Sequence, residues 1–325
     1  MSTLVELARR ALQLLLVLWA IATILFLIFR LMPGNPLAAY IEPTFSLEQQ
    51  QELLQTFGLD KSLPEQYVIY LRNLVRGDLG VSFTYRRPVR DVIASVFPNT
   101  VVLTISALLV SYLIGTVWGA LMGWFRGRRF EKVSVPLVLI GRAAPEFWVG
   151  MILLAVFSFG LGWFPSGGAN TAGAQFGSEL ERFLSLDFWT HLFLPALSLG
   201  LYLFGMPALL MRSSVLEVVK EDYVTVARSK GLSDSRVLFK HVSRNAMFPV
   251  VTAFALGIGY SIGGNVVIET VFSWPGLGRL LVRAVSASDY PLAQGAFFLI
   301  ALVIVIMNFL ADLTYRLLDP RVKNG

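Results

Sequence analysis

The chain has 325 residues, of which 55% are hydrophobic and 15% are charged, against roughly 25% charged in a typical soluble domain. This composition excludes a disordered or collagen-like chain, and the absence of cysteine excludes a disulfide scaffold and thiolate chemistry. A formal charge of +6 could indicate nucleic acid, but the basic residues are sorted between the two ends of long charge-free blocks. These blocks predict an integral membrane protein that binds no nucleic acid.

Six stretches are long and apolar enough to cross a bilayer, which takes about 20 residues in a helix. We expect helices in all of them, because lipid cannot satisfy exposed backbone polar groups. The stretches are residues 11–29, 101–124, 133–164, 192–211, 246–268 and 290–311. The predicted fold class is therefore an all-α membrane protein with six transmembrane helices.

The first stretch follows two arginines, as a signal peptide would. It is too long for the apolar part of a signal peptide, and no small-residue cleavage pattern follows it. We therefore expect a short terminal segment at 1–10 and an uncleaved first transmembrane helix at 11–31. A core of five further transmembrane helices is expected over 98–315.

Lysine and arginine predict the orientation. Outside the long segment 32–97, 16 of them fall on one side of the predicted spans and 3 on the other. The side richer in basic residues is normally cytoplasmic, and short loops carry most of this signal. Both termini, including the tail 316–325, are therefore expected in the cytoplasm.

The segment 32–97 is predicted to form a small helical region outside the membrane. A capping box beginning at Ser46 predicts a helix that stops at Gly58. Pro64 favours the start of a second helix, which would end at Gly77. One face of this second helix would carry Tyr67, Tyr70, Leu71 and Leu74.

Constellations typical of enzymes are absent from the sequence. The two histidines, His191 and His241, have no nearby carboxylate or cysteine cluster at metal-ligand spacing. No phosphate-cradling G-x-x-x-x-G-K-[ST] motif occurs either. We expect no catalytic residue, no metal and no cofactor in this chain, so any nucleotide energy must come from a partner.

Small residues recur at every fourth position of the second stretch, which places them on one helix face. Packing against another helix of the same chain is the first interpretation, and a subunit interface is the second. The residues are Ala107, Ser111, Gly115, Gly119 and Gly123.

Polar residues inside or beside the predicted spans are candidates for a translocation path, because charge is costly in lipid and normally faces a cavity or a partner. Arg142 and Glu146 lie four residues apart in the third stretch, so they could instead pair or extend toward the membrane surface. Asn265 and Glu269, which follow a glycine-rich part of the fifth stretch, are candidates for the same translocation path.

The cytoplasmic segment 212–245 is predicted to hold two helices. Composition predicts a helix over 214–230 that Gly231 stops, and Ser233 then caps a second one. The apolar side of the second helix would carry Val237, Leu238, His241 and Val242. An exposed knob that binds a partner and an amphipathic helix that lies on lipid both fit this pattern.

Residues 223–233 read YVTVARSKGLS, and HVSRNA with Pro249 follows. This segment, 212–249, resembles the cytoplasmic EAA loop of binding-protein-dependent ABC importer permeases, in the variant of the dipeptide/oligopeptide/nickel subfamily. Thr225 and Val226 depart from the Glu-Ala of the generic motif, whereas Ala227 and Gly231 keep its frame.

Six further pieces resemble the same subfamily in the same order along the chain. They are 31–36 (LMPGNP), 58–67 (GLDKSLPEQY), 76–80 with 87–89 (RGDLG, RPV), 269–278 (ETVFSWPGLG), 289–291 (DYP) and 312–321 with its Leu-Asp-Pro-Arg end. The resemblance therefore covers nearly the whole chain.

The resemblance implies the permease subunit of a type I importer of a bacterial or archaeal inner membrane. A second homologous permease, two cytoplasmic ATPase subunits that bind ATP and Mg²⁺, and an extracytoplasmic solute-binding protein are the implied partners, besides the lipid bilayer. The loop would act as a coupling helix in a groove of the ATPase. The residues implied in coupling are Tyr223, Ala227, Arg228, Lys230, Gly231, Leu232 and Ser233.

Short peptides are the expected substrate, with oligosaccharides or nickel as alternatives within the subfamily. A secondary transporter would normally show inverted repeats and ionisable residues near the midplane of the membrane, and only Arg142 and Glu146 come close. A structural scaffold or a membrane enzyme is a third class of function, and the absence of catalytic clusters from the sequence argues against the enzyme.

Overall fold

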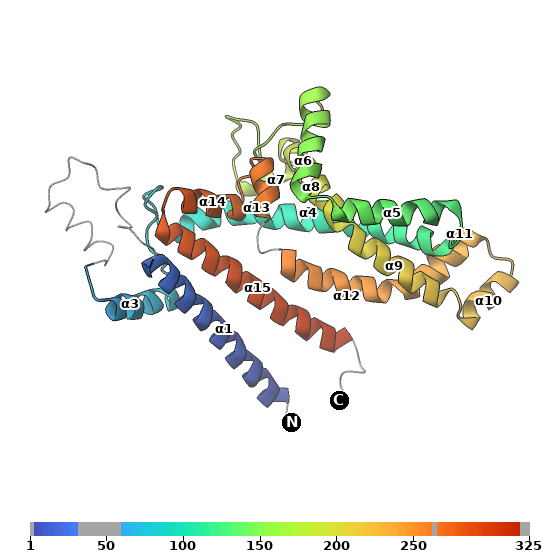
Figure 1. Ribbon diagram of the computed structural model, residues 1–325, viewed down its shortest axis with the longest axis horizontal. Helices are drawn as coiled ribbons and strands as arrows, with labels where there is room; N and C mark the ends of the chain where they lie inside the picture. The colour runs from blue at the N-terminus through green and yellow to red at the C-terminus, as the bar shows by residue number, and fades with distance from the viewer. Residues whose placement is uncertain (1–2, 32–59, 262–264, 319–325) are drawn as a thin grey trace.

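The computed structural model describes residues 3–31, 60–261 and 265–318. Throughout these ranges the regular structure is helical, apart from one isolated bridge between Val81 and Pro88. The long helices lie side by side in a bundle (Figure 1). The helix expected to stop at Gly58 falls outside the described residues.

One end of the bundle holds α1 (Thr3–Leu31), α3 (Leu63–Val75) and the N-terminal part of α15 (Tyr290–Leu318). The second helix expected in the outer segment is α3, and Ser62 begins it through a capping box with Glu65. Gly77 follows its end with a φ of +74°. Two tyrosines of the expected face contact α1: Tyr67 Oη lies 2.7 Å from Thr23 Oγ1, and the ring of Tyr70 stacks on Phe26.

The longest helix, α4 (Val89–Trp124), runs for 36 residues and is about 54 Å long. It begins nine residues before the boundary expected at 98, and it continues through Pro98. The glycines of its small-residue stripe, Gly115, Gly119 and Gly123, pack against α9 (Gly205–Val218) of the same chain, and Ala107 lies against Gly200. A Cβ added at Gly119 would lie on the backbone of Ala208. Packing within the chain, the first of the two interpretations, is confirmed.

The third predicted stretch forms a bent pair of helices, which corrects the expectation of one continuous crossing. Helix α5 (Arg129–Ala143) is followed by α6 (Glu146–Leu153) and the π-helical turn η1 (Leu154–Gly160), and their axes meet at 100°. Pro145 causes the break, because its ring forces the preceding Ala144 into an extended conformation with ψ of 135°. In Figure 1, α6 points away from the long axis of the bundle.

The remaining helices outside the loop between α9 and α12 are shorter or more polar. They are α7 (Glu179–Leu184), α8 (Leu186–Leu203), α12 (Ser243–Ser261), α13 (Val266–Val271) and α14 (Leu277–Ser286). Within the described ranges, α1, α4, α8 and α15 are long and apolar enough to span a membrane, and the bent pair would make a fifth span. The fifth expected stretch begins in α12, which is not among these, and ends beyond residues 262–264.

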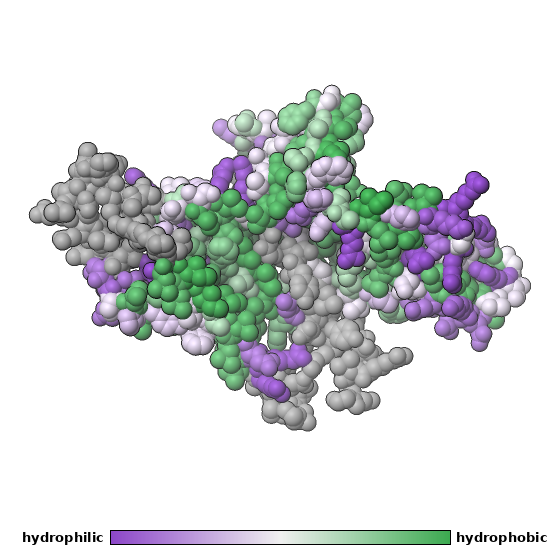
Figure 2. All heavy atoms as spheres, in the orientation of Figure 1, coloured by the Kyte–Doolittle hydropathy of each residue, from purple (hydrophilic) through white to green (hydrophobic). Residues whose placement is uncertain are grey.

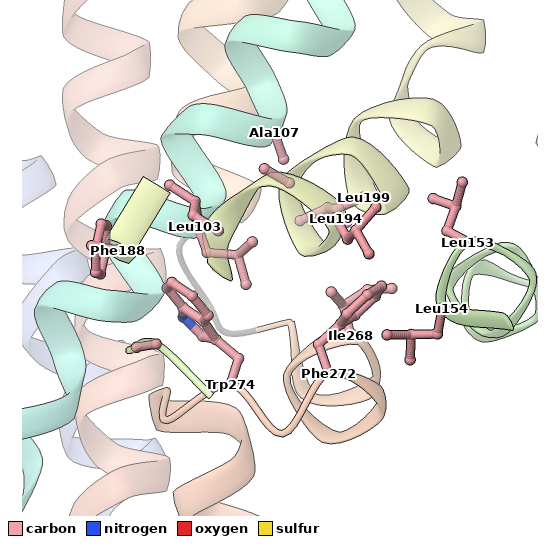
Figure 3. Close-up of a cluster of buried hydrophobic side chains, with 13 residues drawn as sticks. Leu103, Ala107, Leu153, Leu154, Phe188, Leu194, Leu199, Ile268, Phe272 and Trp274 are labelled. Carbon is pink, nitrogen blue, oxygen red and sulfur yellow. The ribbon is translucent and has the colours of Figure 1, made fainter. Parts of the chain in front are cut away.

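A buried apolar cluster joins α4, α6, α8 and α13. Trp274, Phe188 and Phe272 are its largest members and are almost fully buried. Figure 3 shows Trp274 beside Leu103 of α4, and Phe272 and Ile268 facing leucines of α6 and α8. This packing fixes the short helix α13 against the long ones.

Candidate functional site

The loop between α9 and α12 contains two short helices with a tight joint. After α9 ends at Val218, a turn at 219–221 separates it from α10 (Asp222–Ser229). The helix expected over 214–230 is therefore broken into two, which corrects the prediction. Gly231 has a φ of +74°, a conformation that favours glycine. The predicted stop at this residue is confirmed.

The second short helix is α11 (Asp234–Arg236), which continues through the π-helical turn η2 (Val237–Val242) into α12. Ser233 has the extended backbone of an N-cap, but its side chain makes no capping hydrogen bond. The apolar side expected for this helix is largely confirmed, because Val237, Leu238 and Val242 are buried and His241 is half-buried.

An apolar cluster attaches α10 to the bundle. Val224 and Ala227, on the inner face of α10, are 1% and 5% exposed. They pack in one cluster with Val237 of η2, Val215 of α9 and Ala120 of α4. Because the small side chain of Ala227 is enclosed, it serves to seat α10 and is not available to a partner.

The outer face of α10 is exposed. Tyr223, Val226, Arg228, Lys230 and Ser233 lie on the surface, and Leu232 is half-buried. The amide nitrogen of Asn245 donates to Tyr223 Oη at 2.7 Å, and the guanidinium of Arg228 lies 4.8 Å from the ring centroid of Trp124. Figure 2 shows hydrophilic side chains gathered at the end of the bundle formed by α10 and α11. The loop therefore presents a basic surface on an apolar base.

A second candidate region lies where α13 and α14 meet α4. Glu269 is fully buried, and Thr100 Oγ1 donates to its Oε1 at 2.7 Å while the backbone N–H of Arg279 donates to its Oε2 at 2.8 Å. Thr100 Oγ1 also accepts from the N–H of Leu277. Asn265 lies beside this group, and its amide donates to Thr104 Oγ1 at 3.0 Å.

Residues that the sequence reasoning did not select extend this network. Asn99 donates to the carbonyl of Pro275, and its own carbonyl accepts from Trp274 Nε1. Arg182, which precedes α8, donates to the side-chain oxygen of Asn99 at 2.9 Å. No local pattern could have revealed these contacts, because each joins positions more than 80 residues apart.

Arg142 and Glu146, the other two candidates for the translocation path, flank the bend between α5 and α6. The side chain of Arg142 is exposed and that of Glu146 is half-buried. Among the described residues, Arg142 has no carboxylate within 4.0 Å, so the alternative in which the two residues pair is not what the structure shows. The ranges covered also contain no group of three metal-ligating side chains.

The arrangement of helices is that of the membrane subunit of an ABC transporter. A solved structure entitled "Inward facing conformations of the MetNI methionine ABC transporter" matches with a TM-score of 0.51 at 14% identity. The match covers 70% of this chain and 96% of the other, and it shows the type I permease fold.

Two family comparisons then identify the chain. The family described as "Binding-protein-dependent transport system inner membrane component" matches residues 115–324, and the family of the N-terminal part of such components matches residues 3–104. The chain belongs to this family of transport permeases and is a multi-pass membrane protein.

Curated relatives match along almost the whole chain. The di/tripeptide transport system permease protein DppB of Pseudomonas aeruginosa is 37% identical, with 98% of each chain covered. The glutathione transport system permease protein GsiC of Escherichia coli K12 is 36% identical, with 97% of each chain covered.

Proposed function

We propose that this chain is one of two permeases in an ATP-driven importer of short peptides. The full-length similarity to permeases named for di/tripeptide and glutathione transport supports the substrate class. Two cytoplasmic ATPase subunits would hydrolyse ATP with Mg²⁺, and a solute-binding protein would deliver the peptide from outside. The termini and the α10 loop lie in the cytoplasm in this proposal.

The observation that carries the proposal is the construction of the α10 loop. Its inner face is fixed by Val224 and Ala227 in an apolar cluster shared with α4, α9 and α12. Its outer face leaves Tyr223, Val226 and Arg228 exposed. A short helix attached by packing on one side and exposed on the other suits insertion into a groove of a partner protein. A push on α10 would therefore reach three long helices at once.

The path candidates have separate roles in this proposal. Arg142 and Glu146, at the bend, face the translocation path, where a peptide presents both a carboxylate and an ammonium group. Asn265 and Glu269 act at its closed end, and their hydrogen bonds to α4 hold α13 in place.

Substitution of Gly231 tests the coupling role. Gly231→Leu places a large side chain in open space, since no atom lies within 4 Å of an added Cβ. Gly173→Leu is the matched control, because Gly173 also has a positive φ, +83°, and open space but lies in the loop before α7. We expect Gly231→Leu to lose both co-purification of the ATPase and peptide uptake at normal abundance in the membrane, whereas Gly173→Leu keeps both.

Full ATPase co-purification and full uptake in Gly231→Leu would remove this loop from the mechanism. Equal loss in both variants would show that the effect comes from backbone strain and not from the surface of the loop.

Cysteine labelling tests the orientation. The chain has no cysteine, so single cysteines at the exposed positions Ala172 and Ser235 report without background. An impermeant thiol reagent added to intact cells should label Ala172→Cys and not Ser235→Cys. Labelling of Ser235→Cys from outside would overturn the proposed side of the coupling loop.

A further inference from the structure

A cavity of about 390 Å³ lies between α1, α3, the N-terminal part of α15 and the segment 78–83. It belongs neither to the α10 loop nor to the network around Glu269. Its wall is mostly apolar and aromatic, with Phe29 and Phe298 among the rings, and it is interrupted by a few polar side chains. The helices that form it stand at the α3 end of the bundle (Figure 1).

Three polar atoms on residues that line this cavity are buried, and within the described residues none of them makes a well-formed hydrogen bond; Tyr70 and Gln294 interact only weakly with each other. The three atoms are Gln66 Oε1, Tyr70 Oη and Gln294 Nε2. Gln66 is only 8% exposed, and its amide nitrogen is already held by the carbonyl of Lys61 at 2.8 Å. Its oxygen is therefore the end left for a ligand. An unmade hydrogen bond inside a protein costs free energy, so the unpaired oxygen of Gln66, with the weakly paired Tyr70 and Gln294 in the same cavity, indicates that something fills it.

These atoms have defined hydrogen-bonding roles. Gln66 Oε1 can only accept, and Gln294 Nε2 can only donate. Burial raises the pKa of Tyr70 to about 12, and a weak hydrogen bond with the Gln294 side chain lowers it in part. The Tyr70 hydroxyl therefore keeps its proton at neutral pH and can donate as well.

A cation completes the polar wall. Arg30, in the last turn of α1, lines the cavity, and its guanidinium lies 5.8 Å from the ring centroid of Phe26. In the part of the chain that the structure describes, no carboxylate lies within 4.0 Å of Arg30. Asp78 also lines the cavity, but its carboxylate accepts from the N–H of Gly80. The cavity thus offers hydrogen-bond donors at Tyr70 and Gln294, a positive charge at Arg30 and an acceptor at Gln66.

The depth of the cavity distinguishes among ligands. Tyr67 of α3 reaches Thr23, eight residues before the end of α1, so α3 lies along roughly the last 12 Å of that helix. Headgroups and the upper acyl chains of a bilayer occupy this level. Phe298 lies two helical turns along α15 from Tyr290, so the cavity extends toward the apolar interior.

We propose that this cavity binds one phospholipid with a phosphoethanolamine headgroup. The phosphate accepts from Arg30, Gln294 and Tyr70, and the ammonium donates to Gln66 Oε1. The acyl chains leave past Phe29 and Phe298. Such a lipid fastens α3 to α1 and α15, and this role does not depend on the transport function proposed above.

Native mass spectrometry of the full-length chain in mild detergent tests the site. Phosphatidylethanolamine, phosphatidylglycerol and inorganic phosphate are the three probes. We expect one phosphatidylethanolamine to stay bound to the parent chain, and at least tenfold weaker retention in Arg30→Gln and in Gln66→Leu. Arg72→Gln is the matched control, because Arg72 is an exposed residue of α3 that does not line the cavity.

Tyr70→Phe keeps the stacked ring and removes only the hydroxyl, so it reports on the site even where the stronger variants fold poorly. We expect about threefold weaker retention in this variant. Equal retention in Tyr70→Phe and Arg30→Gln as in the parent would overturn the proposal. So would equal binding of phosphatidylglycerol, or displacement of the lipid by inorganic phosphate, which would assign the site to a free anion.

Discussion

The two candidate regions are held by different forces. Around α13 and α14, buried side-chain hydrogen bonds join segments far apart in sequence, through Glu269, Thr100 and Asn99. Around α10, the contacts are apolar, and the side-chain hydrogen bonds of Tyr223 lie on the surface. A buried polar network has a single satisfied geometry, whereas apolar contact has no directional requirement. The first region is built to keep one arrangement, and the second can adjust while it stays attached.

The strongest way to break the rigid region is to remove its central carboxylate. Glu269→Ala leaves the Thr100 hydroxyl and the Arg279 N–H buried without their acceptor. At roughly 1–3 kcal/mol for each group, we expect a loss of about 4 kcal/mol in unfolding free energy. Thermal unfolding of the purified chain measures it, and Glu269→Gln, which keeps one acceptor oxygen, should lose much less. Equal losses would show that charge and not hydrogen bonding is what matters.

The apolar region should respond more weakly and only locally. Val224→Ala removes two buried methyl groups of α10, which costs about 2 kcal/mol. We expect faster amide exchange within 222–242 and reduced uptake, with no change in α13 or α14. Val226→Ala, at an exposed position of the same helix, is the control for stability. A change that spreads to α14 would contradict the separation of the two regions.

Asp289 offers a sharper comparison, because it fastens the segment before α4 to the start of α15. Its Oδ2 accepts from Ser82 Oγ at 2.5 Å and from the N–H of Thr84, while its Oδ1 accepts from the N–H of Leu292. Asp289→Asn replaces an acceptor by a donor, and we expect about 1.5 kcal/mol of destabilisation. Proteolysis at 78–88 should become faster. Unchanged proteolysis would mean that the apolar contacts of this segment suffice.

The smallest effect concerns the capping box of α3 and depends on pH. Hydrogen bonds from the hydroxyl and the N–H of Ser62 lower the pKa of Glu65 below its usual 4.5. Because the folded pKa is the lower one, the stabilisation is present above pH 4.5 and is lost as pH falls through the folded value. Exchange of α3 amides should be slower in the parent than in Glu65→Ala at neutral pH and should converge in acid. A difference in exchange between the parent and Glu65→Ala that persists in acid would contradict a role for the ionised Glu65 carboxylate.

The sequence predicts the structural features that depend on local chemistry. Charge-free runs located most of the long helices, although the run expected over 192–211 is broken between α8 and α9. Gly231 marked the joint, and the four-residue spacing from Ala107 to Gly123 located the face of α4 that meets α8 and α9. The sequence does not predict the 100° angle at Pro145, because a proline predicts a break but not the direction in which packing turns the chain.

Long-range partners were equally hidden. The pieces at 76–80 with 87–89, at 269–278 and at 289–291 resembled one family separately. Only the structure shows that Asp289 accepts from Ser82, which lies between the two parts of the first piece. The break at 219–221 was missed because its residues favour a helix, and tertiary packing of Val224 overrides that preference.

The helix α4 touches both regions. Ala120 belongs to the cluster beneath α10, and Thr100 belongs to the network around Glu269. The two positions are separated by 20 residues, or about 30 Å of helix. Between these points α4 packs closely against α9 at Gly119 and against α8 at Ala107, so it has little freedom to flex. Such a helix behaves as a lever: a tilt of about 10° at the α10 end carries the other end through about 5 Å, enough to pull the Thr100 hydroxyl away from its carboxylate.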